Sequence, residues 1–268
     1  MELLLLHYPF TFLLIAVLIL CRINPAFRYF CKMTFYQVWI FTVSFLVIII
    51  ALPRGRSCEN VKFMRTAILP VKYVLGIKIV LKGKENLRTK KPCIFVLNHQ
   101  NSLDILVMMQ MLPNRCVPIG KKEILYMGTF GLACWLSGLV FIDRKKKEDN
   151  WRSLHLNVFS LLQFHVLIYP EGTRNHSGSM LPFKRGAFQL AVRAQVPIVP
   201  VVISSYNSFY SQKEKRFTSG TSTIQILPPV ETVGLSSDDV PKLTEQVRDS
   251  MMSVYQRISG MTNGGSHE

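Results

Sequence analysis

The stretch FVLNHQNSLDILVMM, residues 95–109, joins two apolar segments through a short polar one. CIFVLN, at 93–98, predicts a buried strand, and LDILVMMQML, at 103–112, predicts a short helix. The polar residues between them place the imidazole of His99 five positions before the carboxylate of Asp104. A strand that leads directly into a helix is typical of α/β folds, so this stretch indicates both the fold class and a candidate site.

The rest of the chain repeats the alternation of strands and helices. Apolar segments that predict further strands lie at 76–83, 138–143, 165–170, 197–205 and 222–229. Helical spacing of apolar residues predicts a helix between Trp151 and Leu161 and a terminal helix from Asp238 to Ile258. Ser102 is a candidate N-cap for the helix at 103–112. The expected fold is therefore α/β, with a mainly parallel sheet flanked by helices.

Two apolar segments, Leu3–Leu20 and Phe35–Pro53, precede this globular pattern. The second is long enough to cross the hydrocarbon of a bilayer at about 1.5 Å per residue. The sequence therefore predicts a hydrophobic two-helix membrane anchor at the N-terminus. The expected division of the chain is an anchor at 1–65, a globular domain at 66–260 and a disordered tail at 261–268.

Basic residues flank the second apolar segment and leave its topology open. Arg22, Arg28 and Lys32 precede it, and Arg54, Arg56, Lys62 and Arg65 follow it. Two full spans would put these groups on opposite sides of the membrane, which the positive-inside tendency does not favour. A hairpin that enters and leaves one leaflet would keep both groups on one side. Both topologies remain open at this point.

The composition indicates anionic partners and a membrane. The chain has 268 residues and a formal net charge of +16, which suits nucleic acid, acidic lipid or phosphorylated small molecules. Hydrophobic residues make up 49% of the chain and concentrate at the N-terminus, which favours a membrane, whereas only the charge supports nucleic acid. The six cysteines lack the spacing of a disulfide framework or zinc site and predict reduced thiols. The histidines suggest no metal site.

His99 and Asp104 have the residue types of a catalytic base and its orienting partner. Inside one continuous helix, residues five apart lie about 140° apart around the axis and do not meet. They meet if His99 occupies the turn and only Asp104 is helical. The carboxylate then fixes the imidazole tautomer and leaves the other ring nitrogen basic. The alternative is a histidine that only satisfies a turn. A Ser-His-Asp hydrolase is disfavoured because the chain has no G-x-S-x-G motif.

A second polar motif, YPEGTRNHSG at 169–178, follows the strand predicted at 165–170. Gly172 lets the backbone approach a ligand, and Arg174 can bind a phosphate in a bidentate manner. Glu171 would hydrogen-bond a hydroxyl or hold Arg174 in place. The alternative is an ordinary polar turn with a local ion pair.

Other cations follow other predicted strands. Arg144, in FIDRKKK at 141–147, is a further phosphate candidate, and weaker ones are Lys121, Lys122, Lys184 and Arg185. In open α/β sheets, ligand sites gather beyond the carboxyl ends of the strands. His99, Arg144 and the turn at 171–174 are therefore expected to converge on one crevice.

Four motifs, in this order, give the chain a family resemblance. NHQNSLD, FIDR, YPEGTRN and VPIVPVVI resemble the four sequence blocks of the glycerolipid acyltransferases, and they lie between residues 98 and 203. GLACWLSGLVFIDRKK is similar to the animal 1-acyl-sn-glycerol-3-phosphate (lysophosphatidate) acyltransferases. The resemblance implies that the domain at 66–260 is catalytic. It would transfer an acyl group from acyl-CoA to the sn-2 hydroxyl of lysophosphatidate, giving phosphatidate.

The resemblance also implies roles for single residues. His99 would be the general base and Asp104 its orienting partner. Arg144 and Arg174 would hold the phosphate, and Lys121 would be a further phosphate contact.

The remaining implied roles concern the shape of the site and its surroundings. Glu171, Gly172 and Thr173 would shape the acceptor site, and Pro200 the acyl-donor side. No cofactor or metal is expected, because acyl-CoA is an activated co-substrate, and no nucleic acid is expected as a partner. The expected location is the endoplasmic reticulum membrane, with the domain facing the cytosol. The alternatives are another lysophospholipid acceptor, transacylation without CoA, or a non-catalytic lipid-binding protein.

Overall fold

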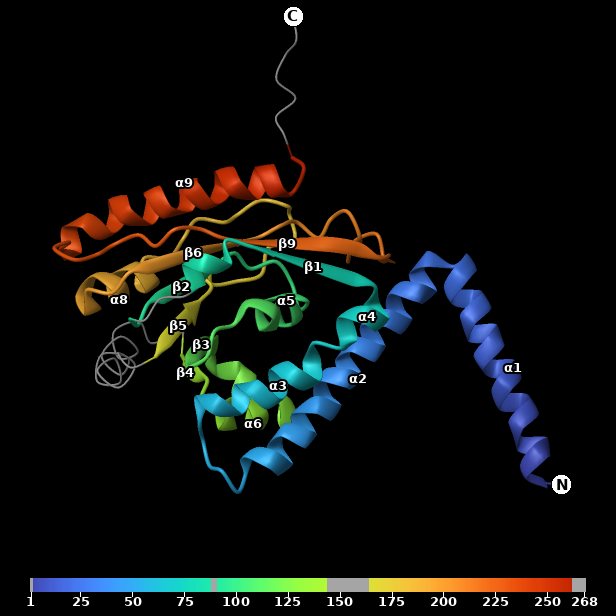
Figure 1. Cartoon of the computed structure of the whole chain (residues 1–268). Helices are drawn as coiled ribbons and strands as arrows, with labels where there is room; N and C mark the ends of the chain where they lie inside the picture. Colours follow the sequence, from blue (N-terminus) through green and yellow to red (C-terminus); the bar gives the residue numbers. More distant parts are fainter. Residues whose placement is uncertain (1, 88–90, 144–163, 262–268) are drawn as a thin grey trace, which may run out of the picture.

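The structure is a computed structural model that describes residues 2–87, 91–143 and 164–261. Its centre is a seven-stranded sheet in the order β1-β9-β6-β2-β5-β3-β4 (Figure 1). The strands are β1 (Ile77–Lys82), β2 (Ile94–Leu97), β3 (Cys116–Lys121), β4 (Val140–Ile142), β5 (His165–Ile168), β6 (Ile198–Ile203) and β9 (Gly220–Ile226). Neighbouring strands pair in parallel except β6 and β9, so the prediction of a mainly parallel α/β sheet is confirmed.

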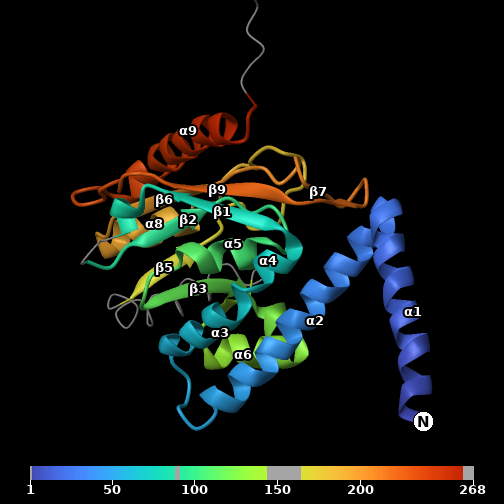
Figure 2. The ribbon, with the colours of Figure 1, turned by 45° about the vertical axis from the view of Figure 1, so that its right-hand side comes forward.

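Helices cover both faces of this sheet (Figures 1 and 2). The α-helices of the described residues are α1 (Glu2–Ile23), α2 (Pro25–Ala51), α3 (Val61–Ile68), α4 (Val71–Leu75), α5 (Asp104–Met111), α6 (Gly128–Leu136), α8 (Gly186–Ala194) and α9 (Val240–Ile258). In β2, Phe95 and Leu97 belong to the core beneath α2, α5 and α6, whereas Ile94 and Val96 belong to the core beneath α8 and α9. A strand buried on both faces has no polar side, which explains why β2 is a continuous apolar run in the sequence.

The predicted strands are confirmed within a few residues, but β3 was not predicted. Its sequence, CVPIGK, contains Pro118 and Gly120, two residue types that are depleted in strands. The structure nevertheless pairs β3 with β5 on one side and β4 on the other. The long apolar run at 124–141 forms α6 and most of β4. The segment predicted to be helical between Trp151 and Leu161 lies outside the described residues.

The start of α5 differs from the prediction in how it is capped. Ser102 makes no cap, and the helix has no side-chain cap hydrogen bond. Instead, Asn101 Oδ1 accepts a hydrogen bond from the Leu103 backbone N at 2.8 Å. The polar turn is therefore held by Asn101 rather than by the serine, and Asp104 becomes the first helical residue.

The second apolar segment forms a longer helix than predicted. α2 begins at Pro25 rather than near Phe35, because Asn24 Oδ1 accepts a hydrogen bond from Phe27 N at 3.0 Å and a proline follows the cap. The chain between the two apolar segments, which carries Arg22, Arg28 and Lys32, is therefore largely helical. Within the part of the chain that the structure describes, Pro25–Ala51 is the one helix long and apolar enough to cross a membrane.

The helix α2 is apolar on two sides, and only one of them contacts the rest of the protein. Tyr36, Ile40 and Val47 are buried against the sheet side of the molecule, where α2 packs on α6 and α3. On the other side Phe41 and Phe45 are 42% and 56% exposed. The preceding helix α1 extends away from the sheet in both ribbon views (Figures 1 and 2). The first apolar segment thus projects from the protein, whereas the second is part of its core.

Candidate active site

The predicted site residues follow strands that end at the same edge of the sheet. β2, β5 and β3 run in parallel, and β6 is parallel to β2. His99 lies just beyond the end of β2, the turn at 171–174 lies just beyond β5, and Lys121 is the last residue of β3. Adjacent parallel strands deliver their following loops to one edge, so residues far apart in sequence meet there.

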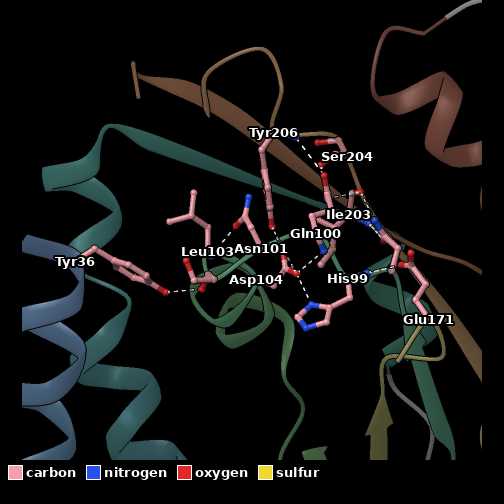
Figure 3. Close-up of polar contacts among 12 residues, drawn as sticks. Tyr36, His99, Gln100, Asn101, Leu103, Asp104, Glu171, Ile203, Ser204 and Tyr206 are labelled. Atoms are coloured by element: carbon pink, nitrogen blue, oxygen red, sulfur yellow. Dashed lines mark hydrogen bonds and ion pairs between the residues drawn. The ribbon is translucent and has the colours of Figure 1, made fainter. Parts of the chain in front are cut away.

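The imidazole of His99 and the carboxylate of Asp104 form the expected pair (Figure 3). Asp104 Oδ2 lies 2.6 Å from His99 Nδ1. A carboxylate accepts a hydrogen bond, so Nδ1 carries the proton and Nε2 is left as the basic nitrogen. The Asp104 side chain is 1% exposed and that of His99 is 20% exposed. The predicted geometry, with histidine in the turn and aspartate at the helix start, is confirmed.

Both oxygens of Asp104 are held by other donors as well. Oδ2 also accepts hydrogen bonds from the backbone N of Gln100 at 2.7 Å and of Asn101 at 3.1 Å. Oδ1 accepts a hydrogen bond from the hydroxyl of Tyr206 at 2.8 Å. Burial, and then the charge of Asp104, raise the pKa of Tyr206 well above its usual value, so the phenol is a neutral donor at ordinary pH.

The side chains on either side of His99 fasten its loop to the end of β6. Asn98 Nδ2 donates to Ile203 O at 3.0 Å, and Asn98 Oδ1 accepts from Ile203 N at 2.7 Å. Gln100 Nε2 donates to Ser204 O at 2.9 Å (Figure 3). The sequence interpretation missed both residues. The signal that could have revealed them is the pattern of two amides flanking a histidine directly after a buried strand.

Glu171 joins the turn after β5 to the backbone of His99. Its Oε1 accepts a hydrogen bond from His99 N at 2.7 Å, and its Oε2 accepts one from Leu181 N at 2.9 Å. The residue is 3% exposed, and burial raises the pKa of Glu171 against the opposing effect of these two donors. Both carboxylate oxygens are thus directed at backbone amides, rather than at Arg174 as one of the sequence alternatives suggested.

The glycine in this turn is required by its backbone and by its neighbour. Gly172 has a φ of +72°, a region that side-chain-bearing residues rarely adopt. A Cβ at this position would lie 2.7 Å from Cε and Nζ of Lys184. In this structure the space beside Gly172 is occupied by the Lys184 side chain, and the expected approach of a ligand to Gly172 stays a prediction.

Arg174 and Thr173 are exposed to solvent, while the ring of Tyr169 packs on that of His99. Both Thr173 and Arg174 are exposed. The rings of Tyr169 and His99 stack with centroids 4.2 Å apart and planes 26° apart. Burial raises the pKa of Tyr169, and the nearby positive charge of Arg174 opposes that shift. Arg174 therefore lies close enough to act electrostatically on a residue that contacts His99.

The structure does not place every predicted residue near His99, and Pro200 is one that lies elsewhere. Pro200 is paired with Val96 in the middle of the sheet. Its neighbours Ile198 and Val202 face the core under α8 and α9, so strand alternation places Pro200 on that face. His99 stacks on Tyr169, which packs against the core on the opposite face.

The two other predicted cations are Lys121 and Arg144. Lys121 is exposed at the end of β3, and Arg144 lies outside the described residues. The binding roles of Lys121, Arg144 and Pro200 stay predictions. Close to the cluster, a small open pocket is lined by polar residues of three loops, including Gln100, Asn175 and Tyr206.

The described part of the chain contains no group of His, Cys, Asp or Glu side chains that could hold a metal ion. All six cysteines are described, and none of them forms a disulfide.

Residues 78–204 match the acyltransferase family. The chain is 49% identical over 265 residues to the 1-acyl-sn-glycerol-3-phosphate acyltransferase alpha of Homo sapiens, and the match covers 98% of this chain and 93% of the relative. The chain belongs to the acyltransferase family. The Bos taurus protein of the same name is 51% identical to this acyltransferase over 244 residues, covering 90% of this chain and 85% of the relative. The resemblance read from the four sequence blocks is therefore confirmed.

A solved structure shows that the fold is shared beyond these close relatives. The crystal structure of PlsC, the 1-acyl-sn-glycerophosphate acyltransferase from Thermotoga maritima, matches with a TM-score of 0.63. The match covers 85% of this acyltransferase and 97% of that chain at 22% sequence identity. The sheet with its helical layers is therefore an acyltransferase fold.

Proposed function

We propose that this acyltransferase moves an acyl group from acyl-CoA to the sn-2 hydroxyl of 1-acyl-sn-glycerol-3-phosphate, giving phosphatidate. The observation that carries the proposal is the 2.6 Å contact between His99 Nδ1 and Asp104 Oδ2, which leaves Nε2 as a base in a partly exposed ring. The relatives of about half identity over most of the chain are named for this acceptor.

The reaction needs a base because an alcohol is a weak nucleophile at neutral pH. His99 Nε2 takes the proton from the sn-2 hydroxyl as the oxygen attacks the thioester carbonyl carbon. A C–O bond forms, the tetrahedral intermediate collapses, and the C–S bond breaks. The imidazolium then returns the proton to the departing CoA sulfur. The thioester is already activated, so these steps require neither a covalent enzyme intermediate nor an additional cofactor.

The neighbouring residues divide into groups that fix the base and groups that bind anions. Asp104 holds the ring and stabilises the imidazolium that forms when His99 is protonated. The exposed Arg174 is placed to bind the acceptor phosphate, as a guanidinium does in a bidentate manner. Lys121, at the end of β3, is proposed to supply further positive charge, and the same role is proposed for Arg144 from its sequence motif. Glu171 and Gly172 set the path of the turn that carries Arg174.

Release of the CoA thiol tests this proposal directly. Purified protein in mixed micelles should release free thiol from acyl-CoA only when lysophosphatidate is added, with an equal amount of phosphatidate formed. A panel of lysophosphatidylcholine, lysophosphatidylethanolamine and lysophosphatidylglycerol separates the alternative acceptors. Phosphatidate formed from a phospholipid donor without CoA would indicate transacylation. A folded protein that releases no thiol with any acceptor would overturn the enzymatic assignment.

The catalytic domain is proposed to face the cytosol at the endoplasmic reticulum membrane, where acyl-CoA is expected. Asn175, His176 and Ser177 form an N-glycosylation sequon next to Arg174. Asn175 N donates to His99 O at 2.9 Å, and its side-chain Nδ2 donates to Ser179 O at 2.7 Å. A glycan on that nitrogen would disturb the loop beside the base, so a lumenal domain is unfavourable.

We propose that α1 and α2 stay within one leaflet, as in the hairpin alternative, with the turn at Asn24 and the C-terminal end of α2 both at the cytosolic surface. One face of α2 packs on α6, so the helix lies along the domain, and its opposite face offers Phe41 and Phe45 to lipid. This arrangement places the basic residues near both ends of α2 against the anionic cytoplasmic leaflet.

Epitope tags test this sidedness, one inserted beside Asn24 at the exposed turn between α1 and α2 and one at the C-terminus. Both tags should be accessible to protease in sealed microsomes without detergent. Access to the C-terminal tag alone would mean that the hairpin is wrong. A protected C-terminal tag together with a glycan on Asn175 would overturn the cytosolic assignment.

A further inference from the structure

The structure assigns Tyr206 as a positioning residue for the proposed reaction, acting on the base through Asp104. Tyr206 lies in the loop after β6, and its hydroxyl donates to Asp104 Oδ1 at 2.8 Å (Figure 3). This inference rests on the proposed function, because it concerns the same base and the same acyl transfer. It extends the histidine–aspartate pair to a third side chain, which comes from a separate part of the sequence.

The two oxygens of Asp104 have separate sets of donors. Oδ2 accepts from the ring of His99 and from the backbone amides of Gln100 and Asn101. Oδ1 is held by the Tyr206 hydroxyl. A carboxylate held at only one oxygen can still rotate about its Cβ–Cγ bond, a torsion with broad, shallow minima. The phenol fixes the second oxygen and therefore the plane in which Oδ2 meets the imidazole.

Tyr206 is itself held in place. Its backbone N donates to Gln100 Oε1 at 3.3 Å, and its carbonyl oxygen accepts hydrogen bonds from Phe209 N and Tyr210 N at 3.0 and 2.8 Å. Its ring packs edge-on against Phe209 with centroids 5.7 Å apart. The side chain is therefore preorganised, and its hydroxyl need not search for the carboxylate during turnover.

No ready substitute exists for this hydroxyl. Asp104 is 1% exposed and Tyr206 is 2% exposed. Removing one hydroxyl leaves less space than a water molecule needs, so Oδ1 would lose its donor without compensation from solvent. Tyr206 also borders the small polar pocket, but its hydroxyl is directed at Asp104 rather than into that space.

The first test is Tyr206→Phe in the full-length enzyme, assayed with acyl-CoA and lysophosphatidate. We expect kcat to fall about tenfold, as for loss of a hydrogen bond to a charged group, with both KM values within about twofold of wild type. The rate is expressed per folded molecule, at a temperature where thermal melting shows that each variant is folded. Tyr255→Phe is the matched control, because Tyr255 is 1% exposed on α9 and its hydroxyl makes no hydrogen bond to Asp104 or His99.

The second test asks whether Tyr206 acts through Asp104. In an Asp104→Asn background, Tyr206→Phe should lower the residual kcat by less than about twofold, because groups that act as one unit are not additive. A full tenfold loss in that background would overturn the inference, as would a rise in KM with an unchanged kcat. If wild type itself fails to acylate lysophosphatidate, the proposed function fails. If wild type is active and Tyr206→Phe keeps full kcat, this inference alone fails.

Discussion

The loop after β2 and the turn after β5 lie next to each other at one edge of the sheet, but they differ in how their side chains are held. In the loop, both oxygens of Asp104 are hydrogen-bonded, and the carboxylate is inaccessible to solvent. In the turn, only Glu171 points inward, while Thr173 and Arg174 are exposed. The two segments are joined at His99, whose backbone N donates to Glu171 Oε1 and whose backbone O accepts from Asn175 N.

This difference indicates which segment performs chemistry and which binds the substrate. A general base needs a fixed ring orientation and one defined tautomer, because proton transfer depends on sub-ångström geometry. A phosphate contact needs an accessible charge whose long side chain adapts to the ligand. The loop should therefore control kcat and the turn should control KM, with Glu171 as the residue that connects them.

The largest effect is expected for His99→Ala, which removes the base. We expect kcat to fall by about 10²- to 10⁴-fold, with thermal stability and membrane association close to wild type. Phosphatidate formation and membrane flotation measure the two properties. His176→Ala is a suitable control, because that histidine is exposed in the neighbouring turn. A folded His99→Ala enzyme with near wild-type turnover would mean that the base is wrongly assigned.

Glu171→Gln should break the connection between the two segments. In this variant an amide nitrogen, which cannot accept a hydrogen bond, replaces one of the two carboxylate oxygens. Either His99 N or Leu181 N would then lose its acceptor. Loss of one such buried contact costs about 1–3 kcal/mol, so we expect kcat to fall about tenfold to a hundredfold. Glu214→Gln, at an exposed carboxylate, should leave the rate unchanged. If kcat is unchanged and KM rises, Glu171 contributes to substrate binding and not to the orientation of the base.

Arg174→Ala should act mainly on substrate binding. Losing a charge-assisted contact costs about 1.5–3 kcal/mol, so the KM for lysophosphatidate should rise about ten- to a hundredfold while the KM for acyl-CoA changes less. Saturation curves for the two substrates separate the effects, and Arg257→Ala, on α9, is the control for loss of an exposed positive charge. A selective rise in the KM for acyl-CoA would assign Arg174 to the phosphates of the donor instead.

The smallest effect is expected for Tyr36→Phe, which tests how far the loop depends on α2. The Tyr36 hydroxyl donates to Ser102 O at 2.9 Å, so the apolar N-terminal helix contacts the loop directly (Figure 3). Loss of this bond should cost about 1 kcal/mol of unfolding free energy and lower kcat only a few-fold. Thermal melting and turnover check both, with the exposed Tyr73→Phe as control. Full wild-type stability would show that α2 does not support the loop through this contact.

The sequence could predict the strands that carry the site because their patterns are local. β2, β5 and β6 are short apolar runs bounded by polar turns, and each was placed within a few residues. β3 was not predicted because Pro118 and Gly120 are residue types that are depleted in strands. Its strand conformation comes from its pairing with β5 and β4. The start of α2 at Pro25 was not predicted. Asn24 caps the helix at this point, and the helix continues through the basic residues that precede the second apolar segment.

The α/β class and the four motifs follow from local sequence patterns, and the pairing of His99 with Asp104 could be predicted as one alternative because the two residues are close along the chain. Which groups hold that pair depends on the tertiary structure. Tyr206 and Glu171 reach Asp104 and His99 across about 70 to 100 residues of intervening chain. The tertiary structure also places Pro200 on the face of the sheet that packs under α8 and α9, opposite to the face of Tyr169. Contacts of this kind depend on which strands become neighbours, and strand order is fixed only when the whole sheet buries its apolar faces.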